Sequence, residues 1–244
     1  MSDTLLVNEI YLSLQGESTF AGLPCIFVRL TACNLRCSYC DTAYAFKEGE
    51  KMSVADVLQR VRELAAPFEN RPGSMKLPLV ELTGGEPLLQ ANVLPLMKQF
   101  CDDGLTVLIE TSGAHDVSKI DPRVRVIMDL KCPSSGEVAH NCWDNIAHLK
   151  PIDEVKFVIG TGEDYEWSKE VLAEHALATR CTVLFSWVAP LSEAQQDKSL
   201  KPVPTGQTPI SRRDLAERIV ADKLPVRFQV QMHKVIWSPE ARGV

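Results

Sequence analysis

The sequence predicts an α/β fold built on a parallel β-sheet. Short runs rich in Val, Ile, Leu and Phe alternate along the chain with segments of helical periodicity, which is the pattern of β-α-β units. A length of 244 residues suits one large α/β domain as well as two small ones, but no repeat and no domain boundary divides the chain. We therefore expect residues 1–244 to form a single domain.

The first predicted strand covers residues 26–30 and runs into a cysteine-rich loop. A helix should begin after Ser53, where Ser-Val-Ala-Asp matches a capping box. Its apolar positions share one helical face: Val54, Val57, Leu58, Val61 and Leu64. A second strand at 79–82 ends in a Gly-Gly turn, and a helix over about 93–101 stops before Gly104.

The second half of the chain continues this alternation. Four more predicted strands share an apolar, partly β-branched composition, at residues 106–110, 125–130, 154–159 and 182–188. A helix near 163–178 lies between the last two, and a second capping pattern at Ser211 begins a helix that reaches about Lys223. Residues 227–232 alternate like a final strand, and the polar, proline-containing segment 191–209 is expected to form a loop or flap.

Polar motifs follow four of the predicted strands at the point where each strand ends. They are the cysteine loop, Thr-Gly-Gly-Glu-Pro at 83–87, Glu-Thr-Ser-Gly at 110–113 and Asp-Leu-Lys at 129–131. The carboxyl ends of parallel strands meet at one edge of a sheet, and α/β proteins bind ligands there. We therefore expect these motifs to form a common site.

Cys33, Cys37 and Cys40 stand in one loop at C-x3-C-x2-C spacing. Three thiolates at this spacing can hold three irons of a [4Fe–4S] cluster, whereas clusters in electron carriers usually have four cysteine ligands. The fourth iron is then free to bind another group, which indicates chemistry rather than electron storage. Zinc on these cysteines, with or without Cys25, is the alternative, although no second C-x2-C pair follows.

The bulk composition excludes several classes of protein. The 26 basic and 32 acidic residues give a net charge of −6, which argues against a general binder of nucleic acid or anionic membranes. No apolar run approaches the roughly 18 residues of a membrane span, and residues 1–5 lack the features of a signal peptide. Eight cysteines without a secretion signal favour reduced thiols, metal ligands and a cytoplasmic location.

Taken together, the cysteine loop and the turn at 83–87 resemble the radical S-adenosylmethionine (SAM) enzymes. In that family the amine and carboxylate of SAM chelate the fourth iron, and a Gly-Gly-Glu-Pro-like turn holds the amine. The resemblance implies a [4Fe–4S] cluster on the three cysteines and SAM contacts from Gly85 and Glu86, since a carboxylate suits an ammonium. It also implies a partial (β/α)6-type parallel barrel.

A second set of residues resembles, more narrowly, the 7-carboxy-7-deazaguanine synthases. Its most specific part is Ser-Leu-Gln-Gly-Glu at 13–17, ahead of the cysteines, and the likeness continues through Asp-Thr at 41–42 to residues 229–234. This resemblance implies a lyase of 7-deazapurine and queuosine biosynthesis. The enzyme would convert 6-carboxy-5,6,7,8-tetrahydropterin to 7-carboxy-7-deazaguanine and ammonia. A 5′-deoxyadenosyl radical would take a hydrogen from C6, the ring would contract, and SAM would be regenerated.

The resemblance also implies roles for individual residues. Substrate contacts fall on seven of them: Leu14, Gln15, Gly16, Arg29, Thr83, Glu110 and His233. The planar fork of Arg29 suits a carboxylate clamp, although a surface ion pair is the alternative reading, and Glu110 can accept two N–H bonds from a guanidine-like edge. Thr42 matches a ligand of Mg²⁺, which prefers oxygen. Asp129, Leu130 and Lys131 match a stretch beside the ribose and carboxylate of SAM.

The implied partners are a pterin substrate, an electron donor such as flavodoxin and a second copy of the chain in a homodimer. Two rival functions stay open: a glycyl-radical activating enzyme, which acts on a protein, and a non-catalytic zinc module. Some members of the family place the substrate beside the terminal carboxylate of the chain. Here eleven residues, among them Trp237 and Pro239, follow His233, so the sequence leaves that contact open.

Overall fold

The computed structural model describes residues 3–70, 75–238 and 241–244. Within them, nine strands form one sheet: β1 (Thr4–Leu14), β2 (Pro24–Leu30), β3 (Glu50–Ser53), β4 (Leu79–Gly84), β5 (Val107–Thr111), β6 (Arg125–Asp129), β7 (Glu154–Ile159), β8 (Thr182–Trp187) and β9 (Arg227–Gln229). The helices are α1 (Val54–Ala65), α2 (Val93–Asp102), α3 (Gly162–Glu174), α4 (Arg212–Ala221) and the short α5 (His233–Ile236).

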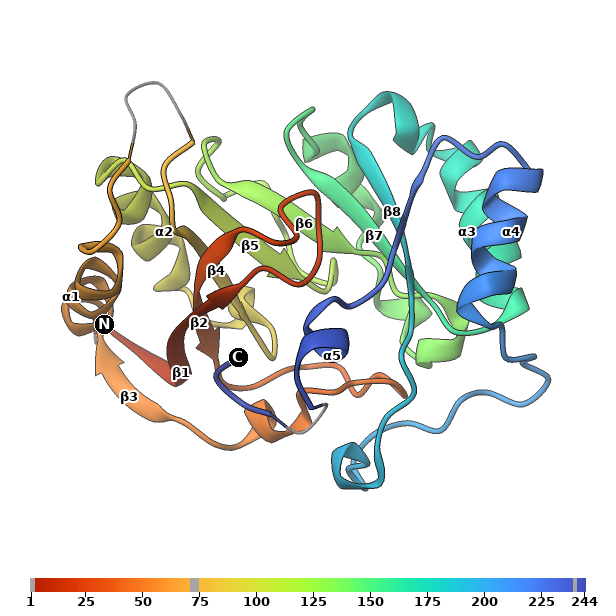
Figure 1. Cartoon of the computed structure of the whole chain (residues 1–244), viewed down its shortest axis with the longest axis horizontal. Helices are drawn as coiled ribbons and strands as arrows, with labels where there is room; N and C mark the ends of the chain where they lie inside the picture. The colour runs from red at the N-terminus through yellow and green to blue at the C-terminus, as the bar shows by residue number, and fades with distance from the viewer. Residues whose placement is uncertain (1–2, 71–74, 239–240) are drawn as a thin grey trace.

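The sheet has the order β3-β1-β2-β4-β5-β6-β7-β8-β9 and curves without closing (Figure 1). Every neighbouring pair from β2 to β9 is parallel, whereas β1 runs antiparallel to both β2 and β3. The prediction of an α/β fold with an open, partial parallel barrel is therefore confirmed. The barrel lacks α-helices between β5 and β6, where residues 112–124 form a loop, and between β6 and β7, where 3-10 turns make the connection.

The predicted helices form where capping residues satisfy their first N–H groups. The Ser53 side chain accepts a bond from the backbone of Asp56 at the start of α1, and Ser211 caps α4 in the same way. α3 ends at Glu174, ahead of the predicted residue 178, because Ala176 adopts a left-handed conformation with φ of 48°. α2 covers the predicted segment.

The sheet differs from the prediction at both of its edges. β1 and β3 were not expected, and both belong to the antiparallel edge of the sheet. The register between β1 and β2 shifts between Val7 and Glu9, so the apolar alternation along β1 is interrupted. The final strand ends at Gln229 rather than at residue 232, because the backbone N–H of Met232 donates to the Gly16 carbonyl instead of to a strand.

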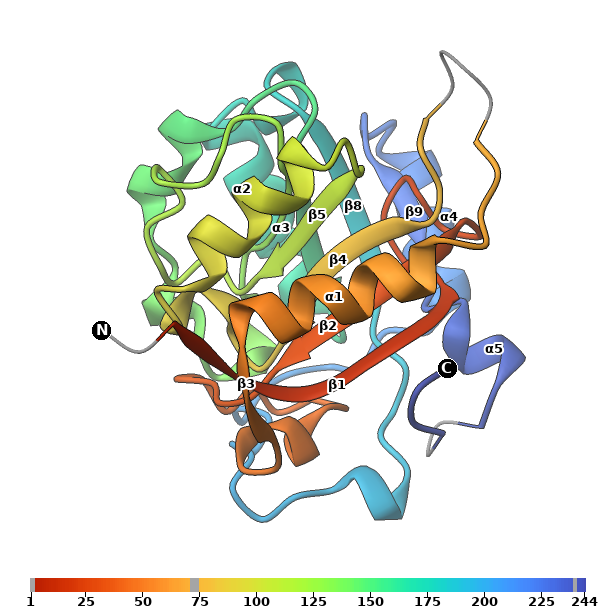
Figure 2. The same cartoon turned by 90° about the vertical axis from the view of Figure 1, so that its left-hand side faces the viewer.

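The two faces of the sheet carry different sets of buried side chains. The outer face packs under α1, α2, α3 and α4 in the main core, as Figure 2 shows for α1 and α2. The inner face carries a smaller apolar cluster of Phe20, Cys25, Phe27, Leu79, Leu108 and Ile127. Side chains alternate along a strand, so the next inward position on these strands is two residues further on. Those positions are polar: Arg29, Glu81, Glu110 and Asp129.

The loop between β1 and β2, residues 15–23, crosses the inner face and reaches the far edge of the sheet (Figure 1). The backbone N–H of Ser18 donates to Gln229 of β9 at 3.0 Å, and Thr19 donates to Glu154 of β7. Met232 binds the Gly16 carbonyl at 2.9 Å. This loop therefore joins the first and last strands of the parallel sheet.

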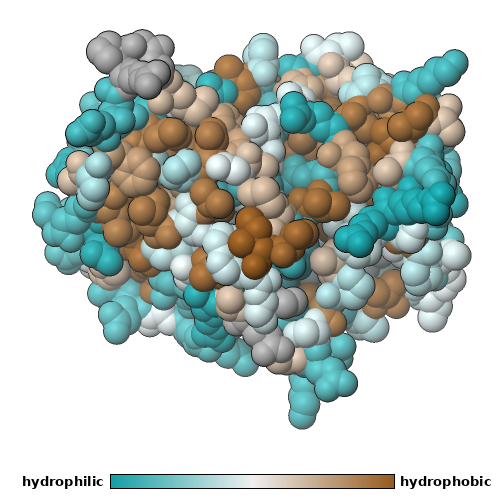
Figure 3. Space-filling view, in the orientation of Figure 1, coloured by the Kyte–Doolittle hydropathy of each residue, from teal (hydrophilic) through white to brown (hydrophobic). Residues whose placement is uncertain are grey.

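Apolar side chains gather over α5 at the centre of the face in Figure 3, where Val235 is 72% and Ile236 49% exposed. The rest of this face mixes polar and apolar patches. Among the described residues, no helix combines the length and the apolar character that crossing a bilayer requires.

Candidate active site

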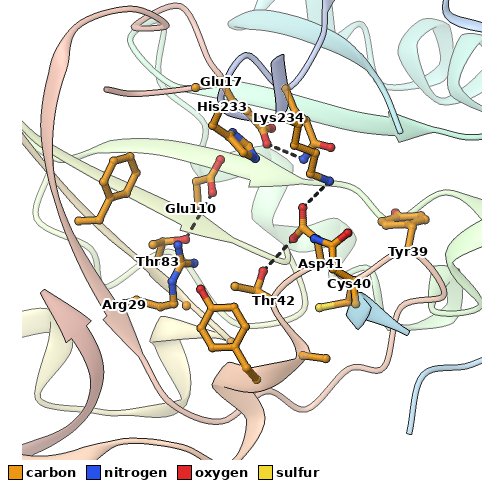
Figure 4. A pocket seen from close by; sticks show the side chains of 18 of the residues that line it. Glu17, Arg29, Tyr39, Cys40, Asp41, Thr42, Thr83, Glu110, His233 and Lys234 are labelled. Carbon is orange, nitrogen blue, oxygen red and sulfur yellow. Dashed lines mark hydrogen bonds and ion pairs between the residues drawn. The ribbon is translucent and has the colours of Figure 1, made fainter. Parts of the chain in front are cut away.

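A cavity of about 620 Å³ opens at the carboxyl ends of the parallel strands. All but two of the residues predicted for the site line it: Leu14, Gln15, Gly16, Arg29, Cys33, Cys37, Cys40, Thr42, Thr83, Gly85, Glu110, Asp129, Lys131 and His233. Figure 4 shows several of these side chains converging from opposite sides of the barrel. The predicted motifs thus share one site.

The Gly-Gly turn at the end of β4 is packed directly against the start of the cysteine loop. Gly85 and Glu86 donate backbone bonds to Leu30 at 3.0 Å and to Ala32 at 2.8 Å. A Cβ on Gly85 would lie 2.0 Å from the Ala32 carbonyl oxygen, and Gly84 has a φ of 136°. Glycine is required at both positions because backbone meets backbone here.

The structure corrects the prediction that the Glu86 side chain faces a ligand. Its carboxylate is fully buried outside the cavity and accepts bonds from Thr111, Ser112 and the backbone of Leu88. These bonds occupy the lone pairs of both oxygens. Glu86 therefore holds the turn to the end of β5, and Gly84 and Gly85 present their backbone to the cavity instead.

The cysteine loop is held mainly by bonds to its backbone, while Cys33 Sγ accepts a bond from the backbone N–H of Leu35 at 3.4 Å. The Arg36 guanidinium donates to the carbonyls of Cys33 at 2.8 Å and Leu35 at 2.6 Å. The backbone of Ser38 donates to Ser135 at 3.1 Å. Burial, together with the charge of Asp41, raises the pKa of the Cys40 thiol to about 12, so a bound metal is needed to keep it as a thiolate.

The three sulfurs fit an iron–sulfur cluster better than the zinc site with Cys25. Within the described part of the chain, no three His, Cys, Asp or Glu side chains are close enough to share one metal ion. A cubane cluster binds each thiolate to a separate iron. Cys25 is excluded as a fourth ligand because it lies fully buried near the start of β2, about 16 Å from the loop at ~3.3 Å per residue.

The motif at 129–131 divides between the cavity and the core. Lys131 Nζ binds Asp129 Oδ2 at 2.8 Å, and both side chains line the cavity. Asp129 Oδ1 and the hydroxyl of Tyr39 are buried without a partner among the described residues, so both fit polar groups of a ligand such as ribose hydroxyls. The Leu130 side chain is buried in the main core and does not line the cavity.

Arg29 projects from β2 into the cavity with two of its three nitrogens bound. Nε donates to Glu9 at 2.7 Å and Nη2 to the Tyr11 hydroxyl at 2.8 Å. Nη1 has no protein partner within the described residues. Burial acts to lower the pKa of Arg29, but Tyr11, Tyr44 and Glu9 outweigh the effect of burial, and the pKa of Arg29 is raised. The ion pair with Glu9 therefore orients a charged fork that retains one donor nitrogen for a ligand.

Two carboxylates and one lysine form a charged group across the cavity. Lys156 Nζ lies 2.9 Å from Glu17 and 3.0 Å from Glu110, and all three line the cavity. Burial acts to lower the pKa of Lys156, but Glu110 and Glu17 raise it well above its usual value. Burial likewise acts to raise the pKa of Glu17, yet Lys156 and His233 lower it to about 2. Lys156 and Glu17 are therefore both charged at neutral pH.

Asp41 and Thr42 lie between the cysteine loop and α5 (Figure 4). The Thr42 hydroxyl donates to Asp41 Oδ1 at 2.9 Å, and Lys234 binds Asp41 Oδ2 at 2.6 Å. A hydroxyl that donates its proton still offers lone pairs, which fits a hard cation. His233 lies against Gly16, where a Cβ would be 2.4 Å from His233 Nδ1.

Two late segments cover the cavity. Residues 194–197 of the predicted flap line it, and Lys201 anchors the flap by donating to the Arg36 carbonyl at 2.9 Å. Trp237 and residues 241–244 also line it, and Arg242 lies 2.7 Å from Glu48. The tail after His233 therefore returns to the site, while Pro239 lies outside the described residues.

Comparisons with known proteins agree with this geometry. The profile of the Radical SAM superfamily matches residues 28–174. The chain is 43% identical over 239 residues to a 7-carboxy-7-deazaguanine synthase of Koribacter versatilis, covering 98% of this chain and 99% of that protein. It is 42% identical over 243 residues to the one of Chlorobaculum tepidum, with 98% and 97% covered.

Solved structures share the fold. QueE from Escherichia coli matches with a TM-score of 0.67 at 24% identity, over 94% of this chain and 95% of that one. Streptococcus suis SuiB bound to S-adenosylmethionine matches with a TM-score of 0.56 at 14% identity, over 82% of this chain and 48% of that one. At these identities the likeness concerns the arrangement of strands and helices.

Proposed function

The chain belongs to the radical SAM superfamily and, within it, to the 7-carboxy-7-deazaguanine synthases, and on this premise we propose that it converts 6-carboxy-5,6,7,8-tetrahydropterin to 7-carboxy-7-deazaguanine with release of ammonia. The observation that carries the proposal is the shared cavity. It brings the cysteine loop and the Gly-Gly turn together with Arg29 and Glu110, a carboxylate clamp and an acceptor for N–H groups.

When bound, the cluster and SAM supply a 5′-deoxyadenosyl radical that can remove a substrate hydrogen. Cys33, Cys37 and Cys40 would hold the cluster, and the free Oδ1 of Asp129 and the ammonium of Lys131 suit the hydroxyls and the carboxylate of SAM. The contribution of the chain is to bind, orient and exclude water.

The substrate is oriented by groups at its two ends. Arg29 would bind the substrate carboxylate through Nη1, while Glu110, held by Lys156, accepts N–H groups from the amino-pyrimidinone edge. The flap residues 194–197 and the tail residues 241–244 would shield the cavity from solvent. We also propose Mg²⁺ at Thr42, an external reductant such as flavodoxin, and a homodimer.

Anaerobic turnover of reconstituted enzyme with 6-carboxy-5,6,7,8-tetrahydropterin, SAM and dithionite tests the function directly. Mass spectrometry should detect 7-carboxy-7-deazaguanine with one ammonia per product, and product should exceed 5′-deoxyadenosine by many turnovers. A chain that holds the cluster and cleaves SAM but leaves the pterin intact would instead act on another substrate, as a glycyl-radical activating enzyme does. Light scattering measures the oligomeric state independently.

Replacing Arg29 with lysine should weaken binding of a carboxylated pterin. Lysine keeps the charge but cannot bind Glu9, Tyr11 and a ligand carboxylate through one planar fork. Losing one charge-assisted bond predicts a dissociation constant roughly tenfold or more higher for 6-carboxypterin, measured anaerobically by fluorescence. Pterin without the carboxylate should bind both proteins equally. Arg62→Lys, on the exposed ion pair with Asp103, is the matched control and should match the wild type.

Replacing Thr42 with alanine should reduce the stimulation of turnover by Mg²⁺. The substitution removes a hydroxyl and a methyl group from the cavity wall, and of these only the hydroxyl can bind Mg²⁺, which depends on oxygen ligands. Thr42→Ser keeps the hydroxyl and should retain the stimulation. Equal Mg²⁺ dependence in wild type and Thr42→Ala would place the ion elsewhere.

A further inference from the structure

Glu81 is a carboxyl group on the cavity wall that the proposed chemistry has not used. It lies on the inner face of β4, between Leu79 of the apolar cluster and Thr83, and is 1% exposed. It lines the cavity beside Gln15 and Glu110. Its one hydrogen bond within the described residues comes from the side-chain amide of Gln15, which donates to Glu81 Oε2.

The charges around Glu81 leave it without a cation of its own. Lys156 is bound to Glu17 and Glu110, and Arg29 to Glu9, so no described cation is hydrogen-bonded to Glu81. The groups that face it come from five elements: Tyr11 on β1, Glu17 on the hairpin loop, Cys25 and Arg29 on β2, Glu110 on β5 and Lys156 on β7. Lys156 alone cannot neutralise the three carboxylates of Glu17, Glu81 and Glu110, so one of the three is neutral.

The neutral one is Glu81. Burial, and after it the negative charge of Glu110, raises the pKa of Glu81 well above its usual value, whereas Lys156 and Arg29 act against the rise without reversing it. The pKa of Glu17 is instead lowered to about 2 by Lys156 and His233, against the effect of burial. The cavity wall therefore presents Glu110, which is bound to Lys156, next to Glu81, which has no cation bound to it and whose surroundings favour its protonated form.

A protonated carboxyl has one O–H donor, while its other oxygen can accept. The Gln15 amide occupies Oε2, so the proton belongs on Oε1. The wall then offers an acceptor at Glu110 and a donor at Glu81 on neighbouring strands. A 2-amino-4-oxo pyrimidine edge is complementary, because its amino and ring N–H groups donate and its ring carbonyl accepts.

We propose that Glu81 is a specificity-determining residue, which meets the substrate as a neutral acid and donates its O–H to the ring carbonyl of the pterin. The inference rests on the proposed function and extends it to the choice among pteridines. A 2,4-diaminopteridine presents a donor in place of that carbonyl, so it opposes the O–H of Glu81. The wall should reject it, although Arg29 can still bind its carboxylate and Glu110 can still accept from its 2-amino group.

Binding of two stable ligands to the anaerobic, reconstituted enzyme tests this assignment. The ligands are 6-carboxypterin and 2,4-diaminopteridine-6-carboxylic acid, and the proteins are wild type, Glu81→Gln and Glu81→Leu. Wild type should prefer the 4-oxo ligand by roughly tenfold or more, since the 4-amino ligand leaves a buried donor unpaired. Glu81→Gln, which keeps a donor and an acceptor, should retain the preference within about threefold. Glu81→Leu should lose the part of this preference that the Glu81 hydroxyl supplies, so the ratio of the two dissociation constants should fall.

The matched control is Glu154→Gln. Glu154 is another buried glutamate on the inner face of the sheet and is bonded to the same hairpin loop through Thr19, but it does not line the cavity. This variant should bind both ligands like the wild type. Thermal unfolding of each protein confirms that it is folded, and if Glu81→Leu fails to fold, the wild type and Glu81→Gln still decide the question.

The pH dependence gives a second readout that a merely structural role would not change. Donation requires the protonated form, so wild-type affinity for 6-carboxypterin should fall as rising pH ionises Glu81. Glu81→Gln cannot ionise and should lack this component, while titration of the ligand affects both proteins alike. Equal pH profiles, or an unchanged 4-oxo preference in Glu81→Leu, would overturn the assignment. If either of these overturning results came from an enzyme that turns over the carboxy-tetrahydropterin, the proposed function would stand and only the assignment of Glu81 would fall.

Discussion

The variant Cys33→Ala is expected to lose its iron and all turnover while the rest of the molecule stays folded. In the proposed site Cys33 supplies one of three sulfurs for a [4Fe–4S] cluster, and the other two cysteines cannot replace it. The loop itself should persist, because Arg36 binds the carbonyl of Cys33 and Glu86 binds that of Ala32. Iron and sulfide assays after anaerobic reconstitution should fall from about four per chain in the wild type to near zero.

The control for this variant is Cys142→Ala, since Cys142 is partly buried like Cys33 but lies outside the cavity. It should keep its iron and its turnover. Far-ultraviolet circular dichroism should show the same helix content in both variants and the wild type. Full iron content with full activity in Cys33→Ala would remove the cluster from this loop.

The variant Lys156→Met should be strongly destabilised and inactive. It removes the one cation that neutralises Glu17 and Glu110, whose side chains are 11% and 25% exposed. Breaking a buried ion pair in this way leaves uncompensated charge and costs about 3–5 kcal/mol in the free energy of unfolding, measured by urea denaturation. Lys98→Met, on an exposed helical ion pair, should change it by less than about 0.5 kcal/mol. Wild-type stability in Lys156→Met would contradict this role of the lysine.

The difference between Lys156→Met and wild type should depend on pH. In the wild type the pKa of Glu17 is lowered to about 2, against an ordinary value of 4.5, by Lys156 and His233 acting against burial. A lowered folded-state pKa stabilises the protein above the unfolded value, and this contribution is lost as pH falls toward the folded value. The two unfolding free energies should therefore differ most above pH 4.5 and converge as pH falls toward 2.

The parallel sheet could be predicted because β4, β5 and β7 are short apolar runs between helices with clear caps, such as Ser53 and Thr161. β1 could not be predicted, because the register shift at Val7 moves its apolar residues from odd to even positions. The alternation of apolar and polar residues that marks a strand is therefore interrupted. The end of β9 depends on a bond from Met232 to Gly16, far away in sequence, which no local pattern encodes.

The motif residues of the site could be predicted because they follow strand ends, where a parallel sheet gathers them. The Glu86 side chain was misplaced because a motif does not show which way a side chain points. The sequence did not identify Glu81 and Lys156 as site residues, because both lie inside buried strands. One signal was available, since each is a charged residue at an inward position of an apolar run. Their pairing depends on which strands become neighbours, and that is a property of the whole sheet.

The loop that joins β1 to β2 also determines when the cavity can form during synthesis. Ser18 bonds to Gln229, 211 residues later, and Glu17 bonds to Gln231, 214 residues later. Contacts at such separation close large loops of chain and form late. A nascent chain must release nearly its whole length from the ribosome before Glu17 and Gly16 meet their partners. The chain therefore completes this wall of the cavity as one of the last events of folding.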